Sequence, residues 1–307
     1  MQSKMRPILV TGAHRTGTTW VGRMLAANPQ TAYISEPLNA LHGPGMLRAN
    51  VEDWYTYICT ENETRYLPAF ADLLSYRYHL AAEVGSLRSA KDFFRMGRDL
   101  AIFWRGRLFH RQPLLKDPFA VFSIVWFAER LNCRIVVTIR HPASFTSSLK
   151  RLNWSFDFRD LLDQPLLMRD QLEPYAQKMK SVSADDIVGQ AALLWTMVYR
   201  IVHDASSRHA EFIVVRHEEI SMDPILQFKD LYRRLGLVFT EDVAEKILKS
   251  SSSENPRELS RKHVHSVNLD SRANLDNWRR RLSLAEIARI RQITESVSSL
   301  YYDDSDW

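Results

Sequence analysis

The sequence is poor in cysteine, since Cys59 and Cys133 are the only two among its 307 residues. They lie far apart and lack the spacing of metal ligands, which suits a reducing compartment better than a disulfide framework. Long apolar runs are missing as well, because even the stretch 101–109 is interrupted by Arg105 and Arg107. A membrane-spanning helix needs about 20 apolar residues, so we expect no transmembrane segment.

An N-terminal leader is not expected either. Within a few residues the chain passes from Met1 through the apolar stretch 7–10 and reaches Gly12, which leaves no room for a signal peptide. With neither a leader nor a membrane span, the expected location is the cytoplasm.

The charge balance is mildly basic, with 41 Lys and Arg residues against 36 Asp and Glu residues. This balance fits an anionic ligand and does not require nucleic acid as a partner. Hydrophobic residues make up 45% of the chain, enough to bury a sizeable core. We therefore expect a single domain over residues 1–307.

Short β-branched runs alternate with longer segments of helical periodicity, which predicts an α/β fold with a central parallel sheet. Two stretches interrupt the alternation. Residues from about 50 to 110 predict a helical insertion, and residues from about 153 to 185 predict a surface insertion of loops with short helix. The tail from Tyr301 to Trp307 is expected to be loose. The predicted strands are Ile8–Thr11, Ala32–Ser35, Leu114–Lys116, Ile135–Ile139 and Phe212–Val215.

The strongest local motif is the glycine loop Gly12-Ala13-His14-Arg15-Thr16-Gly17-Thr18-Thr19. It follows a predicted strand and opens a predicted helix that runs to about Ala27. Backbone N–H groups and the positive end of that helix can bind a phosphate there, and the threonine hydroxyls add donors. A turn that merely links strand to helix is the alternative. We predict an anion site.

A nucleoside triphosphate is not the expected anion. The loop of triphosphate enzymes has Lys directly after its second Gly, whereas Thr18 fills that position here and the cation, Arg15, precedes Gly17. Such enzymes also tend to end a neighbouring strand in an Asp that holds magnesium. The best candidate strand in this chain leads into Arg140, which favours a second anion over a metal ion.

The residues after this strand predict a second phosphate contact. Pro142 fits the first position of a helix, so Arg140 lies at the strand tip and Ser148 lies about two turns into the helix. The two side chains can flank one phosphate. The alternative is purely structural, because a strand that is followed by Arg, Pro and a helix is also a common connection between secondary-structure elements.

Together the two motifs resemble those of the sulfotransferase superfamily, whose donor is 3′-phosphoadenosine 5′-phosphosulfate (PAPS). Its 5′-phosphosulfate loop has the form (Lys or Arg)-x-Gly-(Thr or Ser)-(Thr or Ser), and its 3′-phosphate motif pairs an Arg with a Ser eight positions later. The resemblance implies a P-loop-like three-layer sandwich, 3′,5′-ADP as product and a metal-independent reaction. The implied donor-binding residues are Arg15, Thr16, Gly17, Thr18, Thr19, Trp20, Arg140 and Ser148.

Other parts of the resemblance leave alternatives open. An aromatic residue at the position of Trp20 stacks on adenine in many family members, and a core Trp is the alternative. His217 stands where the family has an aromatic residue that borders adenine, so its role is open. Ser260-Arg261-Lys262 and the segment from Asn277 resemble parts that close over the nucleotide, but a solvated basic run is equally compatible with the stretch 257–281.

Sulfuryl transfer needs cations at the leaving phosphate oxygen and a base for the acceptor proton. By the resemblance, Arg15 and Lys116 are the cations. Many cytosolic members have Lys-x-His at this point and use the His as base, but Pro118 occupies that position here. The phrase Lys-Asp-Pro-Phe is instead similar to tyrosylprotein sulfotransferases and related bacterial enzymes.

The implied base is Glu36, whose phrase Glu-Pro-Leu resembles a segment of carbohydrate 6-O-sulfotransferases. Glu36 ends a predicted strand at the carboxyl edge of the sheet, where α/β proteins bind ligands. A carboxylate that only caps the next segment or pairs with an Arg is the alternative. Asp117 and His14 are the other candidates for the base. No His spacing predicts a metal site.

The acceptor is predicted only by class. Trp54, Tyr55, Tyr57 and the aromatic, arginine-rich segment 93–109 are candidates for an acceptor groove, with a structural core as the alternative. The Glu-Pro-Leu resemblance puts a saccharide or glycolipid hydroxyl first, a natural-product hydroxyl second and peptide tyrosine third. A P-loop kinase of a small metabolite is the rival enzyme class, and a nucleotide-binding scaffold is the non-enzymatic one. The oligomeric state is open, with a homodimer as one option.

Overall fold

A computed structural model of the chain describes residues 5–258 and 267–307. Its centre is a five-stranded sheet in the order β2-β3-β1-β4-β5, and every strand pair in it is parallel. The α/β prediction is confirmed, and the ends of the five predicted strands differ from the observed ends by at most two residues. The strands are β1 (Ile8–Thr11), β2 (Thr31–Ser35), β3 (Gln112–Lys116), β4 (Arg134–Ile139) and β5 (Ile213–Arg216).

Helices connect the strands, and several begin at capping residues visible in the sequence. Ser89 accepts a hydrogen bond from the N–H of Asp92, and Ser283 forms a capping box with Glu286. The α-helices are α1 (Thr18–Leu25), α2 (Leu67–Leu74), α3 (Leu80–Ser86), α4 (Ala90–Leu108), α5 (Ile124–Leu131), α6 (Pro142–Leu152), α7 (Arg159–Leu162), α8 (Pro165–Leu167), α9 (Ala176–Ser181), α10 (Ile187–Arg208), α11 (His217–Met222), α12 (Pro224–Arg234), α13 (Glu241–Ser251), α14 (Asn277–Arg281) and α15 (Leu284–Ser298).

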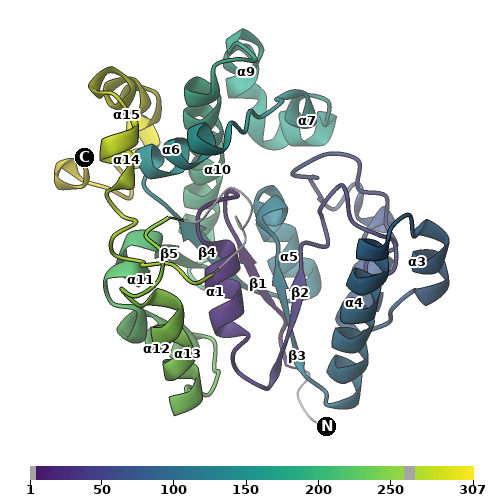
Figure 1. Cartoon of the computed structure of the whole chain (residues 1–307). Coiled ribbons are helices and arrows are strands. Elements are labelled where there is room, and N and C mark those ends of the chain that lie inside the picture. The colour runs from purple at the N-terminus through teal and green to yellow at the C-terminus, as the bar shows by residue number, and fades with distance from the viewer. Residues whose placement is uncertain (1–4, 259–266) are drawn as a thin grey trace.

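The sheet is buried on both faces, which explains why its strands are mainly apolar, with polar residues mostly at their ends. Ile8 and Val10 of β1 point to the face covered by α1, α12 and α13. Leu9 points to the opposite face, which α5 and α10 cover (Figure 1). Helices therefore lie on both sides of one parallel sheet, which is the three-layer arrangement of P-loop-like proteins.

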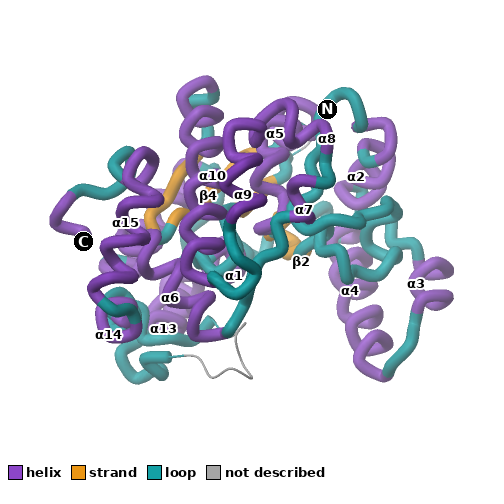
Figure 2. The backbone as a smooth tube through the Cα atoms, turned by 90° about the horizontal axis from the view of Figure 1, so that it is seen from above, coloured by secondary structure: helices purple, strands orange, loops and turns teal. Residues whose placement is uncertain are grey.

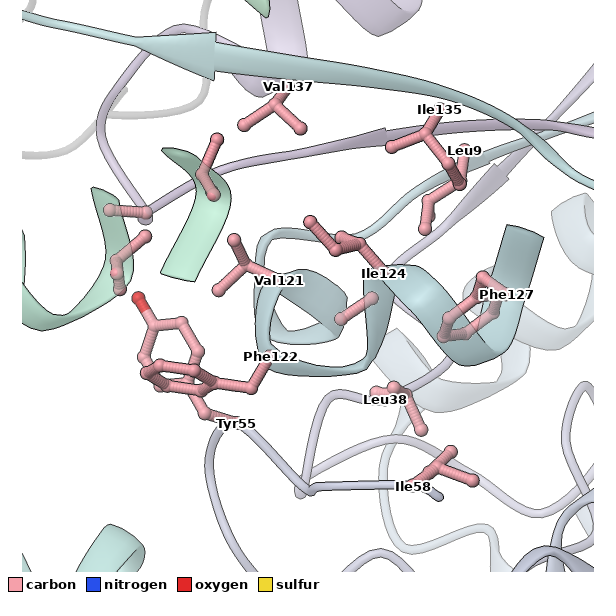
Figure 3. Close-up of a cluster of buried hydrophobic side chains, with 14 of the residues drawn as sticks. Leu9, Leu38, Tyr55, Ile58, Val121, Phe122, Ile124, Phe127, Ile135 and Val137 are labelled. Atoms are coloured by element: carbon pink, nitrogen blue, oxygen red, sulfur yellow. The ribbon is translucent and has the colours of Figure 1, made fainter. Parts of the chain in front are cut away.

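The larger of the two cores lies on the α5 side of the sheet. Figure 3 shows Leu9, Ile135 and Val137 of the sheet packed against Val121 and Phe127. Side chains from the segment after β2 complete this cluster, and they include Leu38, Tyr55 and Ile58. The core thus fixes the segment that leaves the sheet edge after β2.

The stretch between β2 and β3 holds α2, α3 and α4 and contains no strand, as predicted. Its first part, residues 51–62, is irregular, so the helical prediction is wrong there. Side chains bind the backbone of this part: Gln164 accepts from the N–H of Tyr57 at 2.7 Å, and Ser123 accepts from the N–H of Ile58 at 2.9 Å. These bonds replace helical ones. The division into one domain with two insertions stays a prediction.

Residues 153–185 consist of loops with short helices, which are α7, α8, α9 and a π-helical turn at Met168–Leu172. The C-terminal tail is packed, because Tyr302 is buried and its hydroxyl donates to Glu218 at 3.1 Å. The expectation of a loose tail is wrong.

Within residues 5–258 and 267–307, no helix combines the length and apolar character needed to span a bilayer.

Candidate functional site

Parallel strands bring their carboxyl ends to one edge of the sheet, and the predicted site residues gather there. The glycine loop follows β1, Glu36 follows β2, Lys116 ends β3 and Arg140 follows β4 (Figure 1). His217 follows β5 at the same edge. Residues spread over more than 200 positions of sequence therefore meet on one side of the fold.

The glycine loop connects β1 to α1 in the conformation expected of an anion-binding turn. Gly17 is the N-cap of α1, with φ 99°, and Gly12 has φ 136°. A Cβ atom at Gly12 would lie 2.3 Å from the carbonyl oxygen of Thr138. Only glycine fits these two positions, and the turn aims the first N–H groups of α1 out of the sheet edge.

A cavity opens in front of this turn. Seven of the eight predicted donor-binding residues line it, and Thr16 is the exception. The Thr16 side chain is buried and donates to the carbonyl of Ala13 at 2.6 Å, so it supports the loop from inside. The seven predicted residues are Arg15, Gly17, Thr18, Thr19, Trp20, Arg140 and Ser148, and the cavity is also lined by Arg151, His217, Ser250, Glu258, Val267, Leu269, Ser271, Asn274 and Arg281.

The two predicted anion sites are adjacent. The guanidinium of Arg140 donates to the carbonyl oxygen of Arg15 at 3.5 Å, and Nε of Arg15 donates to the hydroxyl of Ser148 at 3.4 Å. The Arg140 backbone is held by Trp195, whose indole N–H donates to its carbonyl at 2.8 Å. Arg140 is only 8% exposed, and its Nε has no hydrogen-bond partner within the described residues.

The cavity is strongly cationic. Burial and then the neighbouring charges of Arg140 and Arg151 lower the pKa of Arg15 to about 10. Burial is also the main reason that the pKa of Arg140 is lowered to about 10. Guanidinium groups held this close repel one another, and a bound anion relieves that repulsion. The site therefore favours a ligand with several negative charges.

Sequence reasoning missed Arg151, and it included Arg281 only as part of the basic stretch 257–281. Arg151 lies three residues after Ser148 on α6 and hence on a neighbouring position of the same helix face, which is a signal the sequence does contain. Arg281 ends α14 and pairs with Glu258 at 2.5 Å. Nothing local in the sequence links Arg281 to the strand of Arg140. The segment Ser260-Arg261-Lys262 lies outside the described residues.

Trp20 forms part of the cavity wall and also packs into the core. Its ring meets those of Phe228 and His217 edge to face, and its indole N–H donates to Ser250 at 2.9 Å. A Cβ atom at Gly17 would lie 2.8 Å from Nδ1 of His217, so the buried imidazole backs the glycine turn. Burial and the charge of Arg140 hold the pKa of His217 well below its usual value, which leaves the ring neutral.

Glu36 and Lys116 form an ion pair at the edge of β2 and β3. The strand register places Ser35 opposite Lys116, and the N–H of Glu36 donates to the carbonyl of Lys116 at 2.7 Å. Asn39 donates to the other carboxylate oxygen of Glu36 at 3.0 Å. Lys116 is 3% exposed, and it lies against α1, since a Cβ at Gly22 would come 3.0 Å from its Cγ.

The two other candidates for the base have structural partners. Asp117 accepts backbone hydrogen bonds from Leu38 and Phe119 at 2.6 and 3.0 Å, and burial raises its pKa to about 7. His14 shares a 2.6 Å hydrogen bond with the hydroxyl of Tyr55, and burial lowers its pKa to about 4. Glu36 is the candidate whose carboxylate is paired with a cation.

The expected acceptor-groove residues separate. Tyr55 is buried behind the glycine loop, and Trp54 packs on Phe119 with ring centroids 4.5 Å apart. Tyr57 lines a second cavity, whose walls carry the carboxylates of Glu52, Asp53, Glu61 and Asp163. The aromatic residues of α4 line neither of these cavities. In the described part of the chain, no group of three or more His, Cys, Asp or Glu side chains is arranged to hold a metal ion.

Comparison with known proteins places these features in a family. The model of the sulfotransferase family matches residues 7–241. Over a stretch of 72 residues, the chain is 32% identical to carbohydrate sulfotransferase 1 of Danio rerio. This match spans 24% of the chain and only 17% of that protein.

One solved structure shows the same fold at low sequence identity. The sulfotransferase domain from the curacin biosynthetic pathway superposes with a TM-score of 0.51 at 15% identity, covering 98% of this chain and 99% of that domain. The sulfotransferase domain of the Synechococcus PCC 7002 olefin synthase gives a TM-score of 0.49 at 17% identity, covering 99% and 98%. Because the family model matches well over half of the chain, the protein belongs to the sulfotransferase family.

Proposed function

We propose that this sulfotransferase takes its sulfuryl group from PAPS and releases 3′,5′-ADP. The observation that carries the proposal is the contact between the two anion sites, in which the Arg140 guanidinium meets the backbone of Arg15 and Arg15 meets Ser148. A donor with phosphate groups at both the 3′ and 5′ positions has the charge that this cavity needs. Adenine would lie against Trp20, close to the buried ring of His217.

The proposed reaction is an in-line transfer. The acceptor oxygen attacks sulfur, and the bond from sulfur to the bridging phosphate oxygen breaks with its electron pair left on the phosphate. Glu36 takes the acceptor proton, while Arg15 and Lys116 stabilise the charge that grows on the leaving phosphate. The ion pair of Glu36 with Lys116 supports this assignment, because it places a base and a cation side by side at the sheet edge.

A saccharide or glycolipid hydroxyl is the first acceptor class in this proposal. The short match to a carbohydrate sulfotransferase supports it, and so does the Glu-Pro-Leu phrase at Glu36. A natural-product hydroxyl and peptide tyrosine follow in that order. The cytoplasmic location and the metal-independent reaction also stay predictions.

The test is transfer of label from PAPS to a panel of saccharide, phenol and peptide acceptors, beside a parallel reaction with ATP and magnesium. We expect transfer from PAPS that survives EDTA. Transfer from ATP alone would establish the rival kinase activity and overturn the proposal. Tight binding of 3′,5′-ADP with no transfer to any acceptor would favour a nucleotide-binding scaffold.

A further inference from the structure

The outer face of α4 exposes more large apolar side chains than a free helix surface normally does. Phe94 is 75% exposed and Trp104 is 62% exposed, and Phe93, Leu100, Leu108 and Phe109 are exposed as well. The opposite face of α4 is ordinary, because Met96 and Phe103 are buried. Contiguous exposed apolar surface of this kind marks an interaction site.

Three of these side chains follow the period of the helix. Phe94, Trp104 and Leu108 lie on one stripe along α4, which the small residues Gly97 and Ala101 continue at intervals of three and four residues. The stripe covers 15 residues, or roughly 21 Å at 1.5 Å per residue. It does not border the donor cavity, and α4 lies at the end of the molecule away from α14 and α15 (Figures 1 and 2).

A row of cations follows one flank of the stripe. Lys91, Arg98 and Arg105 are seven residues apart and hence lie on one line of the helix surface, and all three are exposed. Arg98 is paired with Asp99 at 2.8 Å. In the described part of the chain, no ion pair involves Lys91, Arg105 or Arg107.

We propose that this face of α4, which we call the α4 surface, docks the protein onto an anionic lipid membrane. An amphipathic helix with Trp, Phe and Leu on one side and Lys and Arg beside them lies in the membrane interface, with its cations on lipid phosphates. The convex helix needs no complementary groove in such a partner. This surface is independent of the donor site and of the proposed transfer reaction.

Charge argues against a second copy of this chain as the occupant. In an antiparallel pair of α4 helices, the rows of Lys91, Arg98 and Arg105 from the two copies would face each other, and like charges in that arrangement repel. The anionic surface of a membrane instead complements each cation. The observations therefore favour lipid over self-association.

The experiment measures sedimentation of the full-length protein with vesicles. We expect binding to vesicles of phosphatidylglycerol and phosphatidylcholine, much weaker binding to phosphatidylcholine alone, and release by salt. The double variant Phe94→Ser/Trp104→Ser should bind at least about tenfold more weakly. Each of Lys91→Ala and Arg105→Ala should weaken binding by about fivefold.

A matched control distinguishes the α4 surface from exposed apolar side chains in general. Leu284 is 86% exposed on α15, so Leu284→Ser should bind vesicles like the unmodified protein. All variants should keep the affinity for 3′,5′-ADP and the unfolding midpoint, which separates lost docking from lost folding.

Three results would overturn the proposal. One is vesicle binding that the Phe94→Ser/Trp104→Ser variant retains in full. Another is a dimer in light scattering that this variant dissociates, with no vesicle binding, which would identify a second copy as the occupant. The last is binding to soluble polyglutamate without binding to vesicles, which would identify an acidic protein partner.

Discussion

At the scale of single residues, the proposed donor site concentrates several buried positive charges. Arg140 is buried between other arginines and the carboxylate of Glu218, and within the described residues its side chain donates one weak bond, to a backbone carbonyl. Burying a guanidinium without a strong partner is costly, and an anionic ligand removes that cost. We therefore propose that Arg140 binds a phosphate of the donor.

We predict that Arg140→Ala weakens binding of 3′,5′-ADP about ten- to hundredfold, the value of one hydrogen-bonded charge pair. Binding of 5′-AMP should change far less, because that nucleotide lacks the 3′-phosphate. Calorimetric titration with both ligands gives the comparison, and Arg200→Ala on the exposed side of α10 is the control. Equal losses for the two nucleotides would contradict the assignment.

Glu36 has an unusual backbone conformation. It sits at the end of β2 with φ 53°, so the chain turns sharply there and carries the carboxylate to Lys116. This left-handed conformation is uncommon for Glu, and such strain is found most often at functional sites.

We expect Glu36→Gln to lower turnover about 10²- to 10⁴-fold, because the amide cannot accept the acceptor proton. Affinity for 3′,5′-ADP should stay the same, since Glu36 does not line the donor cavity. Steady-state kinetics and nucleotide titration measure the two quantities, with Glu211→Gln as a surface control. Retained turnover would move the role of base to Asp117 or His14.

At the scale of elements, the described residues between α13 and α14, from Glu258 and from the stretch 267–274, contribute to the wall of the cavity. Glu258 of this segment pairs with Arg281, and that hydrogen bond is the main reason its pKa lies below the usual range. Both residues line the cavity. The carboxylate of Glu258 therefore pairs with Arg281, a cation that would also attract a bound donor.

Removing this carboxylate should favour the donor. We predict that Glu258→Gln tightens binding of 3′,5′-ADP by up to about fivefold, a modest gain because the pair is partly exposed and screened by water. Glu254→Gln, in the same exposed segment, is the matched control. Unchanged or weaker binding would show that Glu258 does not compete with the ligand.

At the scale of the whole molecule, the buried residue His141 is one of the contacts that hold the C-terminal elements to the sheet. His141 stacks on Trp278 of α14 and meets Trp307 with ring centroids 4.4 Å apart. Its backbone N–H donates to Glu218 at 2.9 Å. Neither ring nitrogen has a hydrogen-bond partner in the described chain.

This histidine makes the stability depend on pH. Burial, then the charges of Arg216 and Arg279, lower the pKa of His141 to about 3, so the folded state excludes a proton that the unfolded state binds. The free-energy cost of keeping His141 unprotonated in the folded state is absent above the pKa of about 6.5 that the side chain has in the unfolded chain. This cost grows as the pH falls toward 3. Folding stability is therefore lost on the acid side.

We predict that His141→Phe, which keeps an aromatic ring in the stack, gains stability relative to the unmodified protein as the pH falls. The difference in free energy of unfolding should grow by about 1.4 kcal/mol per pH unit between about pH 6 and 4 and stay constant above pH 7. Denaturant titrations at several pH values measure it, with His110→Phe as an exposed control. A difference that does not vary with pH would refute the prediction.

The sequence by itself determined the sheet and the anion loop. Its β-branched runs specify strands buried on both faces, and its glycines specify a turn that no other residue tolerates, because both are local preferences of short segments. The same patterns place Arg15, Glu36, Lys116 and Arg140 at or just after the ends of strands. The resemblance to sulfotransferase motifs then singled out these four residues before their contacts were known.

Only the tertiary structure decided which distant side chains complete the site. Arg281 and Glu258 reach the cavity through the packing of the C-terminal elements, and Thr16 turns inward because Ala13 and Thr138 offer it partners. The tail is held by the buried contacts of Tyr302 and not by any propensity of its own. The contact of Thr16 with Thr138 joins residues 122 positions apart, and that of Tyr302 with Glu218 joins residues 84 positions apart. No local pattern encodes such contacts, because they form only when the folded core brings the segments together.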